Sequence, residues 1–378
     1  MDLDEQFPLD PGVLHLNHAG VGPWPRVAAA AVSRFTQENL HLGSRHYLRW
    51  LAIETQLRER LARLIHAESG DEIALLKNTS EGLSIIAYGL PWRAGDNVVL
   101  ARDEFPSNRI VWESLSGRFG VEVRLVDLGD AATPEDALIG RMDASTRLLS
   151  VSSVQYATGL RMDLARLGRH CAGRGILFCV DAIQSVGAFP FDVRALHADF
   201  VVADGHKWML APEGVALFYC PERHLDRLQL TQYGWHMVAH PGDFDRPGWE
   251  PAHSARRFEC GSPNSLGIHA LHASLGLLLE VGMEHTAREI ARRVDYLSQG
   301  LEGMGLELLS PSQPGRRAGI LTFRHPRLDN EAIYQALQRR GVLCALRGGG
   351  IRFSPHFYTP LRVLDGALKA VRQATQGR

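Results

Sequence analysis

A lysine in the segment DFVVADGHKWMLAPEGVAL (199–217) has the surroundings of a group that does covalent chemistry. Lys207 follows a short apolar run, so we expect it at the carboxyl end of a strand, where α/β proteins place their ligands. Desolvation lowers the pKa of a lysine, and its neutral amine can form a Schiff base with an aldehyde. An isolated Gly-His-Lys is more often a surface loop, so the hypothesis depends on the neighbouring motifs.

Asp181 ends another apolar run, in ILFCVDAIQSVG (176–187), and Gln184 follows it. A carboxylate buried there needs a cationic partner, because an unpaired buried charge is costly. A protonated pyridine nitrogen is such a partner, and the pairing keeps the ring an effective electron sink. An aspartate that only caps the next helix is the alternative interpretation.

Two further motifs have groups that suit anions. Asn78 and Glu81 stand at capping-box spacing around Thr79 and Ser80, and a helix N-terminus with free N–H groups and hydroxyls suits a phosphate. Arg352, in LRGGGIRFSPHFYTP, has a planar guanidinium that pairs with a carboxylate through two parallel bonds. Taken alone, the first pattern is more often a plain capped helix and the second a surface ion pair.

Together these motifs, above all a strand that ends in VDAIQSVG and a later GHK, resemble the class V aminotransferase family. That family includes cysteine desulfurases, selenocysteine lyases, kynureninase and isopenicillin N epimerase, and the likeness covers roughly residues 14 to 360. The resemblance implies the fold of PLP-dependent transferases (fold type I) and pyridoxal 5'-phosphate (PLP) as the cofactor. It implies that Lys207 is the Schiff-base lysine, Asp181 the pyridinium partner, and Gln184 a donor to the cofactor's phenolic oxygen.

The same resemblance implies roles for residues around the cofactor. Thr79, Ser80 and His206 would bind the phosphate, and Phe105, in DEFPSNRIVW, would stack over the pyridine ring. Gln155, in SSVQYATGL, would lie near the ring oxygen or the substrate. A phenylalanine is otherwise more often part of a core.

On the substrate side, the resemblance implies that Arg352 holds the carboxylate of a small amino acid. Asn17 and His18, in HLNHAGVGPWP, would line the substrate mouth. Ser262, in RFECGSPN, would reach the phosphate of the neighbouring subunit's cofactor. We therefore expect a homodimer with its active sites at the interface.

Two positions depart from the desulfurase pattern. Asp204 stands where desulfurases usually carry a serine that binds phosphate, and a carboxylate repels a phosphate at close range. Either Asp204 points away, or the phosphate pocket is rebuilt around Thr79, Ser80 and His206. A desulfurase also needs a nucleophilic cysteine on a mobile loop, whereas Cys344 lies in a short apolar run and is interpreted as a small buried hydrophobe. Cysteine desulfuration with persulfide transfer is therefore disfavoured.

The family chemistry implies an external aldimine from which Lys207 removes the Cα proton. Elimination at Cβ gives a C–S or C–Se lyase, reprotonation at the cofactor gives an aminotransferase, and reprotonation at Cα gives an epimerase. We favour the first two, and a catalytically silent PLP-fold binding protein remains a further alternative. Arg347, Arg256 and Arg257 are candidates for binding a second carboxylate, but are explained equally well as solvated surface charges.

The elements that position these residues form an α/β pattern. Apolar runs at 73–77, 97–101, 121–126, 147–154, 176–181 and 199–203 alternate with helical segments. This predicts a large, mainly parallel, seven-stranded-type sheet with helices on both faces. A Gly-, Pro- and Trp-rich stretch after residue 221 predicts a long loop, and a smaller α/β unit follows it. The predicted domains are residues 1–30, which pack with the small domain, 31–255 for cofactor binding, and 256–378.

Composition excludes several other classes. Lys plus Arg number 41 and Asp plus Glu 42, which gives a formal charge of -1 and argues against a nucleic-acid partner. The five cysteines show no CxxC spacing, which fits a reducing cytosol. No signal peptide and no long apolar run are apparent, so we expect a cytoplasmic protein without a membrane partner. No HExxH or similar spacing predicts a metal site.

Overall fold

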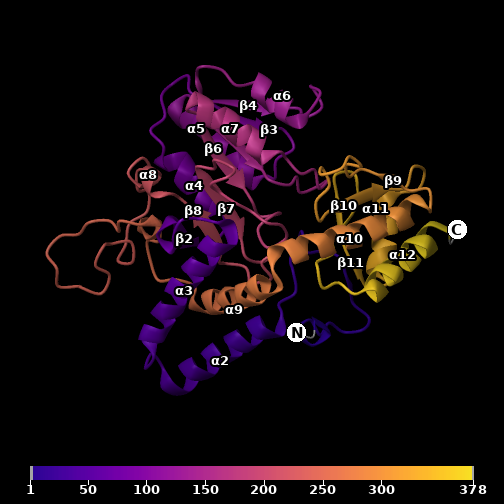
Figure 1. Cartoon of the computed structure of the whole chain (residues 1–378), viewed down its shortest axis with the longest axis horizontal. Coiled ribbons are helices and arrows are strands. Elements are labelled where there is room, and N and C mark those ends of the chain that lie inside the picture. Colours follow the sequence, from indigo (N-terminus) through magenta and orange to yellow (C-terminus); the bar gives the residue numbers. More distant parts are fainter. Residues whose placement is uncertain (1–2, 377–378) are drawn as a thin grey trace.

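A computed structural model of the chain describes residues 3–376, so the outermost residues of the first and last predicted domains lie outside the described part. Its centre is a seven-stranded sheet (Figure 1). The strands of this sheet are β2 (Ile73–Leu76), β3 (Asn97–Ala101), β4 (Glu122–Val126), β5 (Thr146–Ser152), β6 (Leu177–Asp181), β7 (Phe200–Asp204) and β8 (Ala216–Tyr219). They lie in the order β2-β8-β7-β6-β5-β3-β4. Within this sheet only β8 runs antiparallel to its neighbours, so the prediction of a mainly parallel sheet is confirmed.

The continuous apolar runs of the sequence are explained by burial on both faces of the sheet. β3, β6, β7 and β8 are buried at every residue. The neighbouring residues Val201 and Val202 of β7 belong to two different hydrophobic clusters, one on each face. The predicted strands are all present, whereas β8 was not predicted, because its short run has no period of its own.

Helices cover the sheet, as the alternating pattern predicts (Figure 1). They are α4 (Thr79–Gly89), α5 (Ser107–Phe119), α6 (Pro134–Gly140) and α7 (Leu164–Arg174). α4 packs on β7 and β8, α5 on β4 and β5, α6 on β3, and α7 on β6. α4 begins at the predicted cap, where the side chain of Asn78 accepts a hydrogen bond from the N–H of Glu81 at 2.9 Å.

A second, four-stranded sheet forms the smaller unit. Its strands β9 (Glu307–Leu308), β10 (Leu321–Arg324), β12 (Ala345–Arg347) and β13 (Gly350–Phe353) lie in the order β12-β13-β10-β9. The helices of this unit are α10 (Met283–Glu302), α11 (Asn330–Gln338) and α12 (Leu361–Gln376). The N-terminal segment, which contains α1 (Leu3–Gln6), joins the unit because β1 (Leu14–His15) pairs in parallel with β11 (Val342–Leu343).

A helical group connects the two units. α9 (Ser265–Val281) packs against α2 (Arg26–Leu42) and α3 (Tyr47–Ile65), although the predicted domain limits assign α9 to the small domain. Those limits stay a prediction. Within residues 3–376 no single helix is long and apolar enough to cross a membrane, and α9 with α10 passes that test only as a pair bent by 83°.

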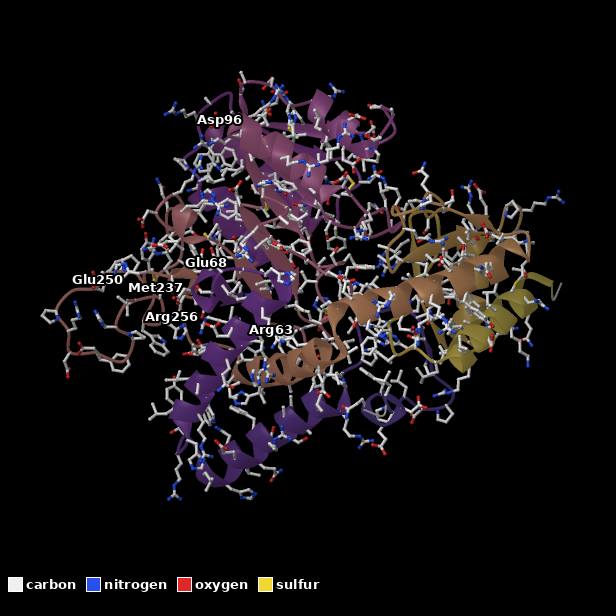
Figure 2. The ribbon with its side chains drawn as sticks, in the orientation of Figure 1. Arg63, Glu68, Asp96, Met237, Glu250 and Arg256 are labelled. Carbon is white, nitrogen blue, oxygen red and sulfur yellow. The ribbon has the colours of Figure 1, made fainter. Side chains whose placement is uncertain are left out.

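A long segment projects from the large unit between α8 (Glu222–Leu225) and the short helix η2 (Ala255–Phe258) (Figure 1). Figure 2 shows Met237, Glu250 and Arg256 together on this side of the molecule. The guanidinium of Arg256 donates hydrogen bonds to the backbone oxygens of His236 and Val238. Arg256 therefore holds the base of the segment. This structural role accounts for the arginine without a substrate carboxylate.

A buried ionic group ties the same segment to α3, which packs against the helix η1 (Gly70–Glu72). Arg58 donates to the carboxylates of Glu54 and Glu259 at 2.5 and 2.6 Å, and the ring nitrogens of His236 lie 3.4 and 3.6 Å from the same carboxylates. Glu54, His236 and Glu259 offer atoms of the kind that bind metals. Because the guanidinium already lies between the two carboxylates, we propose no metal there.

Candidate active site

Asp181 and Lys207 lie at the ends of two adjacent parallel strands. Asp181 is the last residue of β6 and is 2% exposed, and Lys207 lies in the turn that follows β7. Burial raises the pKa of Asp181 to about 6, and the positive charge of Lys207 opposes that shift. Burial lowers the pKa of Lys207 to about 8, and the charge of Asp181 opposes that shift in turn. Both groups therefore titrate close to neutral pH.

Close backbone packing fixes the turn that carries Lys207. The N–H of Gly22 donates to the backbone oxygen of His206 at 2.8 Å, and a Cβ at Gly22 would lie 2.5 Å from the backbone oxygen of Lys207. Gly187, with φ +93°, allows a similar approach to Trp208, whose backbone oxygen would lie 2.5 Å from a Cβ there. Glycine is required at both contacts because a side chain would not fit.

A cavity of about 240 Å³ opens beside Lys207. Its lining includes these predicted site residues: Lys207, Asp181, Gln184, Thr79, Ser80, Phe105, His206 and Arg352. The rest of the lining is Ala19, Gly20, Ser107, Tyr156, Ile183, Asp204 and Arg347. A larger cavity of about 540 Å³ is lined by none of the predicted site residues. The fold therefore gathers most of the sequence-predicted site around one small space.

Gln184 and Phe105 both line the cavity, and their contacts with the cofactor ring stay a prediction. The indole N–H of Trp208 donates to Oε1 of Gln184 at 2.8 Å, and Nε2 of Gln184 donates to the backbone oxygen of Ala19 at 3.1 Å. Because an indole nitrogen only donates, this bond fixes the orientation of the amide. Nζ of Lys207 lies 5.7 Å from the centroid of the Phe105 ring.

Asp204 does not point away from the predicted phosphate-binding turn. Its Oδ2 accepts hydrogen bonds from the N–H and the hydroxyl of Thr79 at 3.2 and 3.3 Å. Its Oδ1 has no hydrogen-bond partner within residues 3–376 and lies 3.9 Å from Nδ1 of His206. Burial raises the pKa of Asp204 to about 6 and lowers that of His206 to about 4. The first alternative, in which Asp204 points away, is therefore wrong. Asp204 takes both donors of Thr79, and of the three residues named for the rebuilt pocket, His206 has a ring nitrogen without a partner among the described residues.

Arg352 enters the cavity from β13 as a buried cation. It is 3% exposed, and Nη1 donates to the backbone oxygen of Tyr156 at 2.7 Å. Nη2 donates to Oδ1 of Asn17 at 3.3 Å, and Nε has no hydrogen-bond partner among the described residues. Burial, together with the neighbouring charge of Arg347, lowers the pKa of Arg352 to about 10. The group is therefore preorganised for an anion that the described residues do not provide.

The prediction that His18 lines the substrate mouth needs correction. His18 is 1% exposed, its Nδ1 donates to the backbone oxygen of Ser354 at 2.8 Å, and its Nε2 accepts from the hydroxyl of Tyr358 at 2.7 Å. It is a core histidine that joins the N-terminal segment to the C-terminal unit. Asn17 contacts the site through its bond to Arg352 and through its backbone oxygen, which accepts from the N–H of Gly20 at 2.9 Å, but it does not line the cavity.

Gln155 also lies outside the cavity lining. Its Oε1 accepts from the N–H groups of Ala157 and Thr158 at 2.8 and 2.6 Å, and its Nε2 donates to the backbone oxygen of Asp103 at 3.0 Å. The amide therefore shapes the loop after β5 instead of facing a ligand. The next residue, Tyr156, lines the cavity in its place.

Ser262 lies apart from the cavity of its own chain. It is exposed and lines a separate cavity of about 260 Å³ with Lys77 and Glu81. Its predicted reach into a neighbouring subunit stays a prediction. Arg257 is not available for a substrate, because it donates to the backbone oxygen of Ala252 and to the carboxylate of Asp226 at 2.8 and 2.7 Å.

Sequence reasoning missed two cavity residues with polar side chains, Ser107 and Tyr156. Tyr156 packs edge-on against the Phe105 ring at a centroid distance of 5.2 Å, and Ser107 accepts a hydrogen bond from Ser80 at 2.9 Å. Ser107 opens α5 after a strand and a turn, which is the same signal that selected Thr79 and Ser80. Tyr156 follows the end of β5, but a strand end alone does not say which of two adjacent side chains faces the cavity.

Comparison with known proteins decides the family. The family model described as aminotransferase class-V matches residues 22–358. The chain belongs to the class V aminotransferase family. A probable cysteine desulfurase of Methanothermobacter thermautotrophicus is 32% identical over 94% of this chain and 93% of that protein. Isopenicillin N epimerase of Streptomyces clavuligerus is 30% identical over 97% of this chain and 96% of that protein.

Two solved structures are also similar over the whole fold. The cystine C–S lyase C-DES, in complex with its reaction product cysteine persulfide, has a TM-score of 0.90 and 25% identity, and covers 97% of this chain and 99% of that chain. The apo cysteine desulfurase from Thermococcus onnurineus NA1 has a TM-score of 0.88 at 23% identity over 100% of this chain and 98% of that chain, which supports the fold alone.

Class V aminotransferases use PLP, and the cavity suits that cofactor. The side chain of Asp181 is buried, and within residues 3–376 its carboxylate accepts one hydrogen bond, from the N–H of Ile183, so it can pair with a ring cation. Nδ1 of His206 is a buried polar atom without a partner within residues 3–376, and the hydroxyls of Ser80 and Ser107, which bond to each other, also line the cavity. Lys207 provides an amine with a lowered pKa. The cavity therefore has a carboxylate that can pair with a ring cation, polar groups that can bind an anion, and an amine that can react with an aldehyde.

Proposed function

We propose that the protein removes the Cα proton of a small amino acid, with Lys207 as the base and Arg352 as the residue that holds the α-carboxylate. When bound, PLP supplies an electron sink for the bonds at Cα. One observation carries the proposal: an amine with its pKa lowered to about 8 shares a small cavity with a buried carboxylate and a buried arginine. Lys207, Asp181 and Arg352 are the residues that we assign to catalysis.

Arg352 orients the amino acid. Its hydrogen bonds to Tyr156 and Asn17 hold the guanidinium plane, while Nε has no partner within the described part of the chain. A carboxylate gains more from a fixed and desolvated guanidinium than from a mobile one in water. Orientation matters because the bond that breaks at Cα must align with the electron sink.

Lys207 moves the proton. Near pH 8 about half of the amines would be neutral, so Nζ accepts a proton at a pH where an ordinary lysine stays charged. Asp181 is ionised above its pKa of about 6, and its negative charge stabilises a cation held in the cavity. Phe105 and Tyr156 add apolar surface beside the amine, which limits the access of water.

For the reaction type, we infer transamination or β-elimination of the C–S or C–Se type rather than desulfuration through a protein persulfide. Cys344 is 5% exposed, and burial raises the pKa of its thiol to about 12. The thiolate is the nucleophilic form of cysteine, so this thiol is poorly suited to attack sulfur. The similarity to a cystine C–S lyase supports the elimination branch.

An amino-acid epimerase is the second candidate function. It is supported by the 30% identity to isopenicillin N epimerase over 97% of this chain. Epimerisation returns the proton to Cα, so it would exchange Cα–H for solvent deuterium and invert the centre without a keto product. Chiral analysis of the recovered amino acid distinguishes it from transamination and elimination.

The decisive experiment uses the small number of lysines in the chain. Only Lys77, Lys207 and Lys369 are present, and Lys77 and Lys369 are exposed. Borohydride reduction of the PLP-saturated protein followed by peptide mapping should find the cofactor on Lys207 alone, with the other two as internal controls. Label on Lys77 or Lys369 instead would refute the assignment. Spectra and product analysis with a panel of amino acids then identify the branch.

We also propose a homodimer with shared sites. Ser262 is exposed and lies away from the cavity of its own chain, as expected of a residue that acts on a partner subunit. Several large apolar side chains are exposed at the end of the α2–α3 hairpin, namely Leu40, Leu42, Tyr47 and Leu48. Sedimentation should give a dimer, and Ser262→Ala should weaken PLP binding. A monomer that binds PLP normally would contradict this proposal.

A cytoplasmic location is a further proposal. All five cysteines are unpaired, and four of them are buried. Free thiols persist best in a reducing compartment. Cell fractionation would test it.

A further inference from the structure

Two arginines reach the cavity from one β-hairpin, and we propose that the outer one, Arg347, binds a second acidic group of the substrate. The substrate class is then an amino acid whose side chain ends in a carboxylate. This inference rests on the proposed function, because it assumes that Arg352 holds the α-carboxylate.

The hairpin geometry places both guanidinium groups on one face. β12 and β13 are joined by Gly348 and Gly349, whose φ angles are +57° and +76°, as a tight two-residue hairpin turn requires. In the register Arg347 lies opposite Gly350, and Ala345 lies opposite Arg352. Opposite residues, and residues two apart on a strand, share a face, so Arg347 and Arg352 are diagonal neighbours.

Close packing fixes the position opposite Arg347. Gly350 has no side chain, and a Cβ there would lie 2.4 Å from the backbone oxygen of Phe323, so glycine is required. The register is therefore fixed by backbone packing. Arg347 and Arg352 both line the cavity together with Lys207.

Among the described residues, no carboxylate pairs with the charge of Arg347. Its one hydrogen bond goes from Nη1 to the backbone oxygen of Leu346 at 2.8 Å, and none of the ion pairs within residues 3–376 includes it. Its charge contributes to the lowered pKa values of both Lys207 and Arg352. Like charges in a partly desolvated cavity repel one another, and an anion bound between them removes that cost.

The two arginines lie at different depths in the cavity, and this difference sets the orientation of the substrate. Arg352 is 3% exposed, whereas Arg347 is exposed at the rim. The α-carboxylate at Arg352 would therefore be buried with the reacting Cα, and the far end of the side chain would extend toward Arg347. Arg256 and Arg257, the other candidates for a second carboxylate, use their guanidinium groups elsewhere.

The first test compares substrates with and without a distal carboxylate. Arg347→Gln should lower kcat/KM for the acidic amino acids by about 10- to 100-fold, mostly through KM, because one charge-assisted hydrogen-bonded contact is lost. For amino acids of similar length without the acid, the change should stay below about twofold. Arg340→Gln, an exposed arginine outside the cavity lining, is the matched control and should leave both values unchanged.

A second test uses binding without turnover. The PLP-loaded protein should bind succinate at least about tenfold more tightly than propionate, and Arg347→Gln should remove that difference. Arg347→Lys, which keeps the charge but not the fork, should retain part of it. This comparison in the unaltered protein stands even if a variant fails to fold.

The outcomes separate the two proposals. If borohydride labels Lys207 but succinate and propionate bind equally, the second-carboxylate site is refuted and the proposed function stands. If Arg347→Gln weakens both kinds of substrate equally, Arg347 acts in general binding and the specificity inference is likewise refuted. If Lys207 carries no label in PLP-saturated protein, the proposed function itself fails.

Discussion

The cavity has two walls that balance charge in different ways. The sheet wall, Asp181, Gln184 and Lys207, comes from the ends of β6 and β7 and the turns after them. On it a buried carboxylate faces an amine, and the amide is held between Trp208 and Ala19. The hairpin wall, Arg347 and Arg352, carries two cations, and no carboxylate within residues 3–376 pairs with either.

This difference indicates a division of labour. A wall whose charges are compensated inside the protein can hold the same cofactor whatever the substrate. A wall of uncompensated cations gains its partners only when an anionic substrate enters. Changes on the sheet wall should therefore affect every amino acid alike, and changes on the hairpin wall should discriminate among them.

The largest effect is expected at the sheet wall, in Asp181→Asn. The amide cannot stabilise a ring cation, so kcat should fall by about 10²- to 10³-fold for every amino acid that the enzyme accepts. Steady-state kinetics with several substrates checks this, and Asp130→Asn, at an exposed site, is the control. A loss confined to one substrate would break the division between the two walls.

The pH dependence of the rate at which the apoprotein binds PLP tests the sheet wall further. Because burial lowers the pKa of Lys207 to about 8, the neutral amine becomes more abundant as pH rises toward 8 and saturates above it. The rate of capture of PLP by apoprotein should rise about tenfold per pH unit below 8. Stopped-flow absorbance near 410 nm measures it.

Asp181→Asn removes a charge that raises the pKa of Lys207, so the midpoint of capture should move to lower pH in that variant. A midpoint near 10 in the unaltered protein would mean that the sheet wall does not desolvate the amine. The unfolded state should also bind more protons than the native state between about pH 8 and 10.5, so in apoprotein this lysine should add stability as pH rises through that window.

Asp204 lies next to the sheet wall but is an exception to the charge balance there, because one of its carboxylate oxygens has no partner among the described residues. Its pKa is raised from 3.8 to about 6, so ionisation costs stability as pH rises through that window. Asp204→Asn keeps an oxygen for the two donors of Thr79 and should stabilise the apoprotein by about 1–3 kcal/mol above pH 6.

Urea denaturation near neutral pH and near pH 4 checks the prediction for Asp204, since the stabilisation should disappear at the lower pH. Asp226→Asn, at an exposed aspartate paired with Arg257, is the control and should not stabilise the protein. A loss of stability at both pH values would mean that the charge of Asp204 is needed by the fold.

The same contrast explains what the sequence can predict. Lys207 and Asp181 were predictable because the ends of adjacent parallel strands meet at one edge, and unbroken apolar runs reveal such strands. The contact between Asp204 and Thr79 was not, since it joins residues far apart in the chain. His18 and Gln155 were misplaced because the direction of a side chain after a strand depends on the following turn, which has no periodicity.

The smallest effect is expected at Cys344, which lies beside the hairpin wall. With its pKa near 12, only about one thiol in 10⁵ is ionised at pH 7, so Cys344→Ala should change turnover by less than about twofold. Cys260→Ala, at the one partly exposed cysteine among the five, is the matched control. If C–S cleavage disappeared in Cys344→Ala but not in Cys260→Ala, the thiol would be the sulfur acceptor, the desulfurase branch would be restored, and the hairpin wall would take part in the chemistry as well as in selection.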